Sequence, residues 1–583
     1  MTFRAPVRDI AFALETVGHT DLIARGFPDL DGETVTAVLE AAGSFVDSEL
    51  APLNRRGDIE GARYENGKVT AAPGFAEAYK AFADGGWNSL AADPAFGGQG
   101  LPKALELSVF EMVHAANMAF GLCPMLTLAA IEALSQHGTE RQKRLVLPKL
   151  VSGEWTGAMC LTEPQAGSDL AALTTVARPD GKGGYQLHGQ KIFITWGDHD
   201  AADNICHLVI ARTPDAPPGV KGISLFLTSK YRLSETGELG GRNDFRPGSI
   251  EHKLGIHGSP TCVMLYEGAE AELVGELGQG LPHMFVMMNA ARLQVGVQGV
   301  AIAERAFQQA LEFSQERRQG RAVWSADQPA AIYDHPDVRR TLMLMKAKIE
   351  AGRAICLTTG VLADLARLAD TEADRAAALA RQELLTPIAK AWSTDVGVEV
   401  ASMGLQVHGG MGFIEETGAA QHYRDARIAP IYEGTNGIQA NDLVGRKVRM
   451  ADGAVMAELC GEMRLAAQTL SERPDLAIVG HRLAQGVAAL EQATAWLAAH
   501  GGPDALTAAT PYLRLAGDVV GGWMLGRQAL AAAGSDDPWL QGKGALARLY
   551  SGQVLALAPG MAQGLMDGSD DVQSTSARAL TGA

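Results

Sequence analysis

One carboxylate lies in the run Ile-Tyr-Glu-Gly-Thr-Asn-Gly-Ile-Gln at residues 431–439, between a tyrosine and a glycine-threonine turn. A carboxylate held in a tight, mostly apolar turn becomes more basic through desolvation. Glu433 can then act as the positioned base that a weak carbon acid requires. The same letters are also typical of a helix end followed by a new cap. Taken alone, the run therefore predicts either a base or an ordinary turn.

Two upstream runs could bind a flat heterocycle. Residues 161–169, Leu-Thr-Glu-Pro-Gln-Ala-Gly-Ser-Asp, offer hydroxyls and backbone N–H groups that can also accept a phosphate. Residues 189–197 contain a strand whose alternation places Phe193 and Thr195 on one face, where a ring could stack and bond. The alternatives are a capped turn for the first run and a half-buried strand with Phe193 in the core for the second.

In this order, the three runs resemble the acyl-CoA dehydrogenase family. Residues 316–321 and 405–413 add to the resemblance, which extends from about residue 40 to 447. Residues 253–261 and 335–340 are similar to a larger subgroup with a helical C-terminal extension. That subgroup includes 3-methylmercaptopropionyl-CoA dehydrogenases and bacterial enzymes for longer acyl chains.

The resemblance implies α,β-dehydrogenation of an acyl-CoA thioester to trans-2-enoyl-CoA. Glu433 would remove the α-proton, and the β-hydride would pass to N5 of FAD. An electron-transfer flavoprotein would then take the electrons.

The resemblance also implies the binding residues. Those expected at FAD are Leu161, Thr162, Ser168, Phe193, Thr195, Arg317, Gln319, Gln406, Gly409, Gly410 and Thr435, with Arg317, Gln319 and residues 406–410 reaching a neighbouring subunit's cofactor. Those expected at the substrate are Ser168, Asn289, Arg292 and Gly434. The chain departs from the family at Gly437, where Gln or Glu is frequent, and at Pro336, where Gln is frequent; both departures concern single FAD contacts.

Other residues compete with Glu433 for the role of base. Glu415 and Glu416 are adjacent, and burying two neighbouring charges is costly, so we expect exposure. Glu163 precedes a proline and is expected to fix its turn. His408 beside two glycines is expected to pack or to form a hydrogen bond.

The pattern of apolar residues along the chain changes from helical to β-rich and back to helical. It predicts a mainly α fold with a central antiparallel β domain and an extra C-terminal helical domain. The resemblance implies that the first three parts are acyl-CoA dehydrogenase-like: an α domain, a β-barrel-like domain and an α bundle. The expected parts are an N-terminal segment (1–37), a helical domain (38–157), a β domain (158–278), a helical bundle with Glu433 (279–450), and further helices with a mobile tail (451–583). Prolines predict a new helix or kink at Pro387 and a break at Pro559.

The bulk composition excludes several classes of protein. The net charge of −17 argues against a general nucleic-acid binder. The apolar stretch 119–134 is expected to be broken at Pro124 and carries Glu132, so it is too short and interrupted for a membrane span. The first residues lack the apolar core of a signal peptide. Six scattered cysteines predict buried thiols in a reducing compartment, hence the cytoplasm, and no metal site.

Two alternatives to the dehydrogenase remain. An acyl-CoA oxidase that uses oxygen would have the same base and loops. A non-catalytic flavoprotein of this fold could bind nucleic acid through a basic C-terminal region, but the chain from residue 451 holds 13 acidic and 8 basic side chains. We expect that extension to cover a subunit face, and we expect a homodimer.

Overall fold

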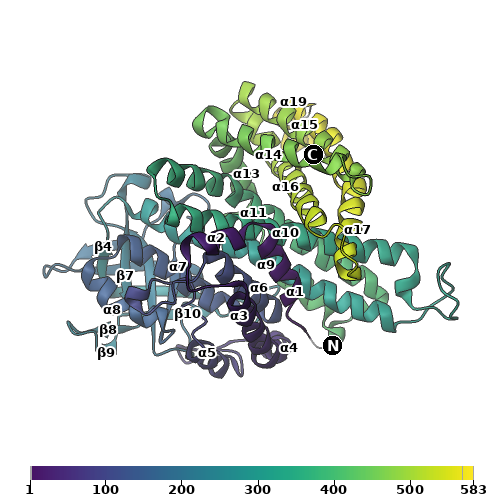
Figure 1. Cartoon of the computed structure of the whole chain (residues 1–583). Coiled ribbons are helices and arrows are strands. Elements are labelled where there is room, and N and C mark those ends of the chain that lie inside the picture. Colours follow the sequence, from purple (N-terminus) through teal and green to yellow (C-terminus); the bar gives the residue numbers. More distant parts are fainter. Residues whose placement is uncertain (1–2, 568, 582–583) are drawn as a thin grey trace. The chain divides into compact units, whose positions relative to one another are not determined.

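The structure, a computed structural model, describes residues 3–567 and 569–581 and divides into two units (Figure 1). The sheet unit comprises Glu40–Gln294, and the helical unit comprises Pro6–Leu39 and Val295–Ala583. Helices α3 (Gly32–Phe45) and α9 (Gly280–Glu316) contain residues of both units.

The helices of the sheet unit include the apolar helix α7, which begins where the Asn117 side chain accepts a hydrogen bond from the Phe120 N–H. They are α4 (Ala51–Glu60), α5 (Phe75–Asp84), α6 (Lys103–Ala116), α7 (Met118–His137) and α8 (Glu140–Val151). The expected interruption at Pro124 is wrong, because α7 continues through it; burial of an apolar helix can offset the roughly 3 kcal/mol cost of an internal proline. Among the described residues, α7 alone is long and apolar enough to cross a membrane, but 89% of its apolar window is buried, as in a core helix.

Five strands of the sheet unit close into a ring. They are β4 (Val176–Pro179), β5 (Tyr185–Thr195), β6 (Asn204–Arg212), β7 (Ile223–Ser229) and β11 (Thr261–Val274). The ring closes because β11 pairs with β5 and β7, β6 pairs with β4 and β7, and β4 pairs with β5. Buried side chains from these strands, including Leu187, Val209 and Phe226, form one apolar cluster.

The remaining strands extend this sheet or form hairpins. Strand β3 (Trp155–Cys160) pairs with β6, and β10 (Phe245–Ile250) pairs with β11. The hairpins are β1 (Arg63–Glu65) with β2 (Lys68–Thr70), and β8 (Tyr231–Leu233) with β9 (Leu239–Arg242). The barrel-like β domain is thus confirmed, but β6 is parallel to β3 and β4, so the sheet is mixed. Long connections allow such parallel pairs.

The helical unit contains both long and short helices. They are α1 (Val7–Thr16), α2 (His19–Gly26), α10 (Pro336–Leu368), α11 (Glu372–His408), α12 (Ala419–Ala426) and α13 (Asn436–Gly445). Helices α9 and α11 cross closely at glycines, since a Cβ on Gly299 would lie 2.3 Å from the Ser393 carbonyl oxygen. A Cβ on Gly397 would lie 2.8 Å from the Gly299 oxygen. This close crossing fixes the position of α11.

The C-terminal extension packs against α11 and α13 through α16 (Figure 1). Trp392 of α11 donates its indole N–H to Asp518 at 2.8 Å, and a Cβ on Gly517 would collide with the same indole. The extension consists of α14 (Ala454–Ser471), α15 (Ala477–Ala499), α16 (Pro503–Ala531), α17 (Pro538–Gln553), α18 (Ala558–Asp567), α19 (Ser569–Ser574) and α20 (Ala577–Thr581).

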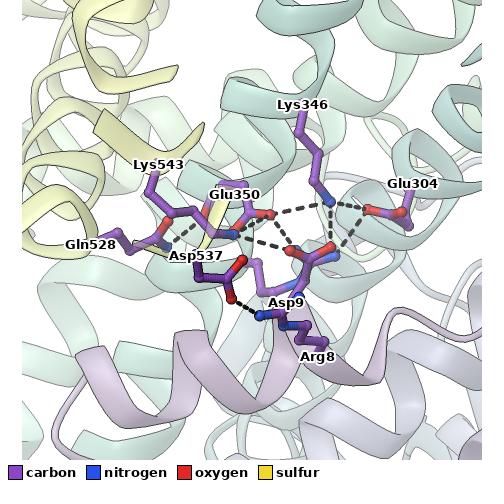
Figure 2. A network of polar contacts seen from close by, with 9 residues as sticks. Arg8, Asp9, Glu304, Lys346, Glu350, Gln528, Asp537 and Lys543 are labelled. Atoms are coloured by element: carbon purple, nitrogen blue, oxygen red, sulfur yellow. Dashed lines mark hydrogen bonds and ion pairs between the residues drawn. The ribbon is translucent and has the colours of Figure 1, made fainter. Parts of the chain in front are cut away.

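A buried charge network joins α1, α9, α10 and α17 (Figure 2). Asp9 accepts hydrogen bonds from Lys346 at 2.7 Å and Lys543 at 3.0 Å. Glu350 lies 3.1 Å from each of these ammonium groups. Burial would raise the pKa of Asp9, but the two lysines outweigh it and hold that pKa far below its ordinary value. The network therefore ties both ends of the chain to the central helix α10.

The structure corrects two boundaries expected from the sequence, at Pro387 and at Pro559. No new helix begins at Pro387, which lies inside α11. The chain leaves α17 at Gln553, before Pro559, and that proline lies in the first turn of α18, where its missing N–H costs nothing. The tail contains two short helices, α19 and α20, within its described residues.

Candidate active site

The loop 161–169 of the sheet unit is built around the buried carboxylate of Glu163. One oxygen accepts hydrogen bonds from Gln165 Nε2 and from the Thr174 N–H and hydroxyl, at 2.7, 2.7 and 2.8 Å. The other accepts from the Thr175 N–H and hydroxyl, at 3.1 and 2.6 Å, and from Lys191 Nζ at 2.8 Å. The expectation that Glu163 fixes its turn agrees with this arrangement.

Lys191 connects this loop to strand β5. Its buried ammonium donates to Glu163 and, at 2.9 Å, to the Leu161 carbonyl. The Ile192 N–H donates to the Thr162 carbonyl at 2.9 Å. Burial would raise the pKa of Glu163, but Lys191 and the other donors lower it to about 2. Burial lowers the pKa of Lys191, and Glu163 opposes that shift. The pair holds Leu161 and Thr162 against β5.

Strand β5 presents Phe193 to solvent. The pairing of β5 with β11 shifts register between Cys262 and Met264, opposite residues 191–194. At this bulge Phe193 adopts a left-handed φ of 61°, and its side chain is 59% exposed. The alternative that Phe193 is a core residue is therefore wrong. Thr195, two residues on, is half-buried.

These groups fit a flat, hydrogen-bonding ring. An exposed aromatic side chain supplies a stacking surface, and the half-buried residues Thr162 and Thr195 carry hydroxyls that can donate and accept hydrogen bonds. The donor set is that expected for the isoalloxazine of FAD. Ser168 is exposed in the same loop.

Glu433 occupies a strained turn of the helical unit. Its φ is 56°, and Gly434 follows with a φ of 81°, so two successive residues are left-handed. For a residue other than glycine this conformation costs roughly 1–3 kcal/mol and persists only when the surroundings impose it. Atom Oε2 of Glu433 is shielded from solvent. Thr435 then caps α13 by accepting the Ile438 N–H at 3.2 Å.

Tyr432 anchors the turn from its other side. Its hydroxyl donates to the buried Gln298 side chain on α9. Burial, together with the adjacent Glu433 carboxylate, raises the pKa of Tyr432 well above its ordinary value. The phenol therefore remains a neutral donor.

The other predicted site residues lie in several places. Arg292 is buried on α9 and donates to exposed Asn289 at 3.0 Å. Arg317 and Gln319 are exposed on a segment that pairs with residues 330–332. Exposed residues at the C-terminal end of α11 are Gln406, Gly409 and Gly410. The structure thus groups Leu161, Thr162, Phe193 and Thr195 in the sheet unit, and Glu433, Gly434 and Thr435 in the helical unit.

The rival bases are placed as the sequence predicted. Glu415 and Glu416 are exposed, and Glu415 pairs with Arg424 at 3.0 Å. His408 is buried, stacks on Phe313 with ring centroids 4.5 Å apart, and donates Nδ1–H to the Gly404 carbonyl. Its role is packing and hydrogen bonding.

Four residues that support the two turns were not predicted from the sequence: Lys191, Gln298, Lys390 and Asn436. Lys191 lay in a recognised run, and its apolar neighbours at 192–194 were a signal for a buried cation. Lys390 and Gln298 lie in helices far from 433 in sequence, where no local pattern marks them.

Comparison with known proteins covers nearly the whole chain. Family models match residues 32–154 (acyl-CoA dehydrogenase, N-terminal domain), 158–269 (middle domain), 278–448 (C-terminal domain) and 459–575 (acetyl-CoA dehydrogenase C-terminal like). The 3-methylmercaptopropionyl-CoA dehydrogenase of Ruegeria pomeroyi is 48% identical over 95% of this chain and 96% of its own.

Two solved structures share the fold. ACDH-11 of Caenorhabditis elegans, in complex with C11-CoA, matches with a TM-score of 0.79 and 22% identity over 95% of this chain and 92% of its own. An acyl-CoA dehydrogenase of Bacillus anthracis complexed with FAD matches with a TM-score of 0.75 and 21% identity over 94% and 90%. Both likenesses extend through the C-terminal extension.

Proposed function

The chain belongs to the acyl-CoA dehydrogenase family, and from this premise we propose that Glu433 is the base that removes the α-proton of its acyl-CoA substrate. The protein is a FAD-dependent oxidoreductase that acts on acyl-CoA. The proposed reaction breaks the α C–H and β C–H bonds and forms a trans-2 double bond. Bound FAD supplies the acceptor for the β-hydride.

The observation that carries the assignment is the strained turn at Glu433. A left-handed non-glycine residue beside a left-handed glycine is costly, and such strain gathers at functional sites. The turn fixes the direction of one carboxylate and shields one of its oxygens. A base so oriented needs little reorganisation to meet a weakly acidic C–H group. Glu415 and Glu416 lack this shielding because they are exposed.

We also propose the cofactor and substrate contacts that membership of the family implies. Thr162 and Thr195 would hydrogen-bond the flavin ring, and Phe193 would pack against it. Thr435, whose hydroxyl caps α13, would contact the pyrophosphate at a helix N-terminus. Gly434, Asn289, Arg292 and Ser168 would contact the substrate.

The finer biological setting is also proposed. Exposed Arg317, Gln319 and the end of α11 suit contacts with a neighbouring subunit's FAD, and we propose a homodimer. An electron-transfer flavoprotein would accept the electrons. All six cysteines are free and buried, as the sequence predicted, and this suits a cytoplasmic enzyme.

An anaerobic titration tests the reaction. The purified flavoprotein is mixed with acyl-CoAs from short to long chain, including the 3-methylmercaptopropionyl-CoA named for the Ruegeria relative. We expect flavin bleaching and a trans-2-enoyl-CoA product with at least one substrate. Absence of both across the panel contradicts the proposal. Peroxide formation in air, in preference to reduction of an electron-transfer dye, would instead identify an oxidase.

A further inference from the structure

A buried lysine lies behind the Glu433 turn. Lys390 of α11 is fully buried, and its ammonium donates to the Gly434 carbonyl at 2.9 Å and to Asn436 Oδ1 at 2.8 Å. Both acceptors lie within three residues of Glu433. A cation therefore holds the peptide between Gly434 and Thr435, one residue after the left-handed glutamate.

Asn436 provides a second connection between the Glu433 turn and α11. Its amide nitrogen contacts the Ala391 carbonyl, the Thr394 hydroxyl and the Asp395 carboxylate, at 3.0, 3.0 and 2.7 Å. Its backbone N–H donates to the Pro430 carbonyl at 2.9 Å. The two ends of the turn, residues 430 and 436, are thus closed on each other and fastened to one helix.

That helix is itself held on two sides. Helix α11 packs closely against α9 at the glycine crossing, and the Trp392 indole N–H donates to Asp518 of α16. Helix α16 also packs against α13, which begins at Asn436. The C-terminal extension therefore supports both partners of the Lys390–Asn436 contact.

We infer that Lys390 is a positioning residue for the base: by binding the Gly434 carbonyl it imposes the left-handed turn that directs the Glu433 carboxylate. The inference rests on the proposed role of Glu433. Charge-assisted hydrogen bonds are about twice as strong as neutral ones. Without the ammonium, the peptide plane between residues 434 and 435 can rotate, and Glu433 can relax toward a right-handed φ. A displacement of about 1 Å at a reacting group can reduce a rate roughly a hundredfold.

The test compares Lys390→Met with Lys348→Met. Lys348 is a matched control because it is also a buried lysine of the helical unit, 3% exposed, but it donates to Glu399. Each holoenzyme is mixed anaerobically with saturating acyl-CoA, and the rate of flavin reduction and the substrate Kd are measured separately. We expect Lys390→Met to reduce flavin about a hundredfold more slowly with FAD content and Kd unchanged, Lys390→Arg to recover part of the rate, and Lys348→Met to retain the wild-type rate.

Two results overturn the inference: a wild-type rate in Lys390→Met, or an equal loss in Lys348→Met, which would reduce the effect to general destabilisation. If Lys390→Met does not fold, Asn436→Ala replaces it, and we expect the rate of flavin reduction to fall about tenfold. An unchanged rate in Asn436→Ala would contradict the inference. Glu433→Gln in parallel separates the two claims, because a rapid rate in that variant refutes the base itself, whatever Lys390 does.

Discussion

Replacing Lys191 by methionine should loosen the 161–175 segment by a predictable amount. The change removes the ammonium from a pair whose side chains are 0% and 2% exposed. Removing one partner of a buried ion pair usually costs about 3–5 kcal/mol, because the remaining charge loses its counter-charge. Glu163 keeps five other donors, from Gln165, Thr174 and Thr175. We therefore expect the lower end, about 3 kcal/mol.

Hydrogen exchange of the native holoenzyme measures this cost locally. A change of about 3 kcal/mol corresponds to a little over a hundredfold faster exchange through segment opening. The Ile192 amide and the amides of Thr174 and Thr175 report it directly, since each is bonded within this arrangement. We also expect FAD to be lost more readily on dilution.

Two further variants make the prediction refutable. Lys149→Met removes an exposed lysine paired with Glu154 at 2.6 Å, and such surface pairs contribute about 0–1 kcal/mol. The double variant Lys191→Met/Glu163→Gln removes the unpaired charge and should exchange more slowly than Lys191→Met. Unchanged exchange in Lys191→Met, or a double variant faster than the single one, would refute the reasoning.

Three other perturbations have definite expected outcomes. Since the pKa of Glu163 is depressed to about 2, its stabilising effect is present above the ordinary value of 4.5 and is lost as pH falls from there toward about 2. Exchange in segment 161–175, measured relative to the intrinsic rate of an unstructured amide at each pH, should therefore accelerate over that interval in the wild type and much less in Glu163→Gln. Asp9→Asn should lower the melting temperature and expose α1 to protease, because two lysines lose a buried counter-charge. Arg8→Ala removes a mostly exposed ion pair with Asp537 and should change the melting temperature little. Arg317→Ala should leave the melting temperature of the apoprotein unchanged, since the side chain is exposed, but should lower FAD content; unchanged FAD content would remove Arg317 from the cofactor site.

The sequence predicted the arrangement of helices and strands and located both turns, because their residues are contiguous. It could not predict how each turn is held. Glu163 is bonded to threonines 11 and 12 residues later, and Lys390 lies 44 residues before Gly434. Such pairings depend on tertiary packing, which no local spacing records. The interruption expected at Pro124 and the new helix expected at Pro387 are absent for the same reason, since both prolines are buried in helices whose packing overrides local propensity.

The assignment of the base is tested most directly by anaerobic single-turnover reduction of three variants, Glu433→Gln, Glu415→Gln and Glu416→Gln. All three should bind FAD, since none changes the side-chain volume appreciably. We expect acyl-CoA to bleach the flavin of Glu415→Gln and Glu416→Gln at the wild-type rate and to leave Glu433→Gln oxidised. Rapid bleaching of Glu433→Gln would contradict the account and place the proton acceptor elsewhere.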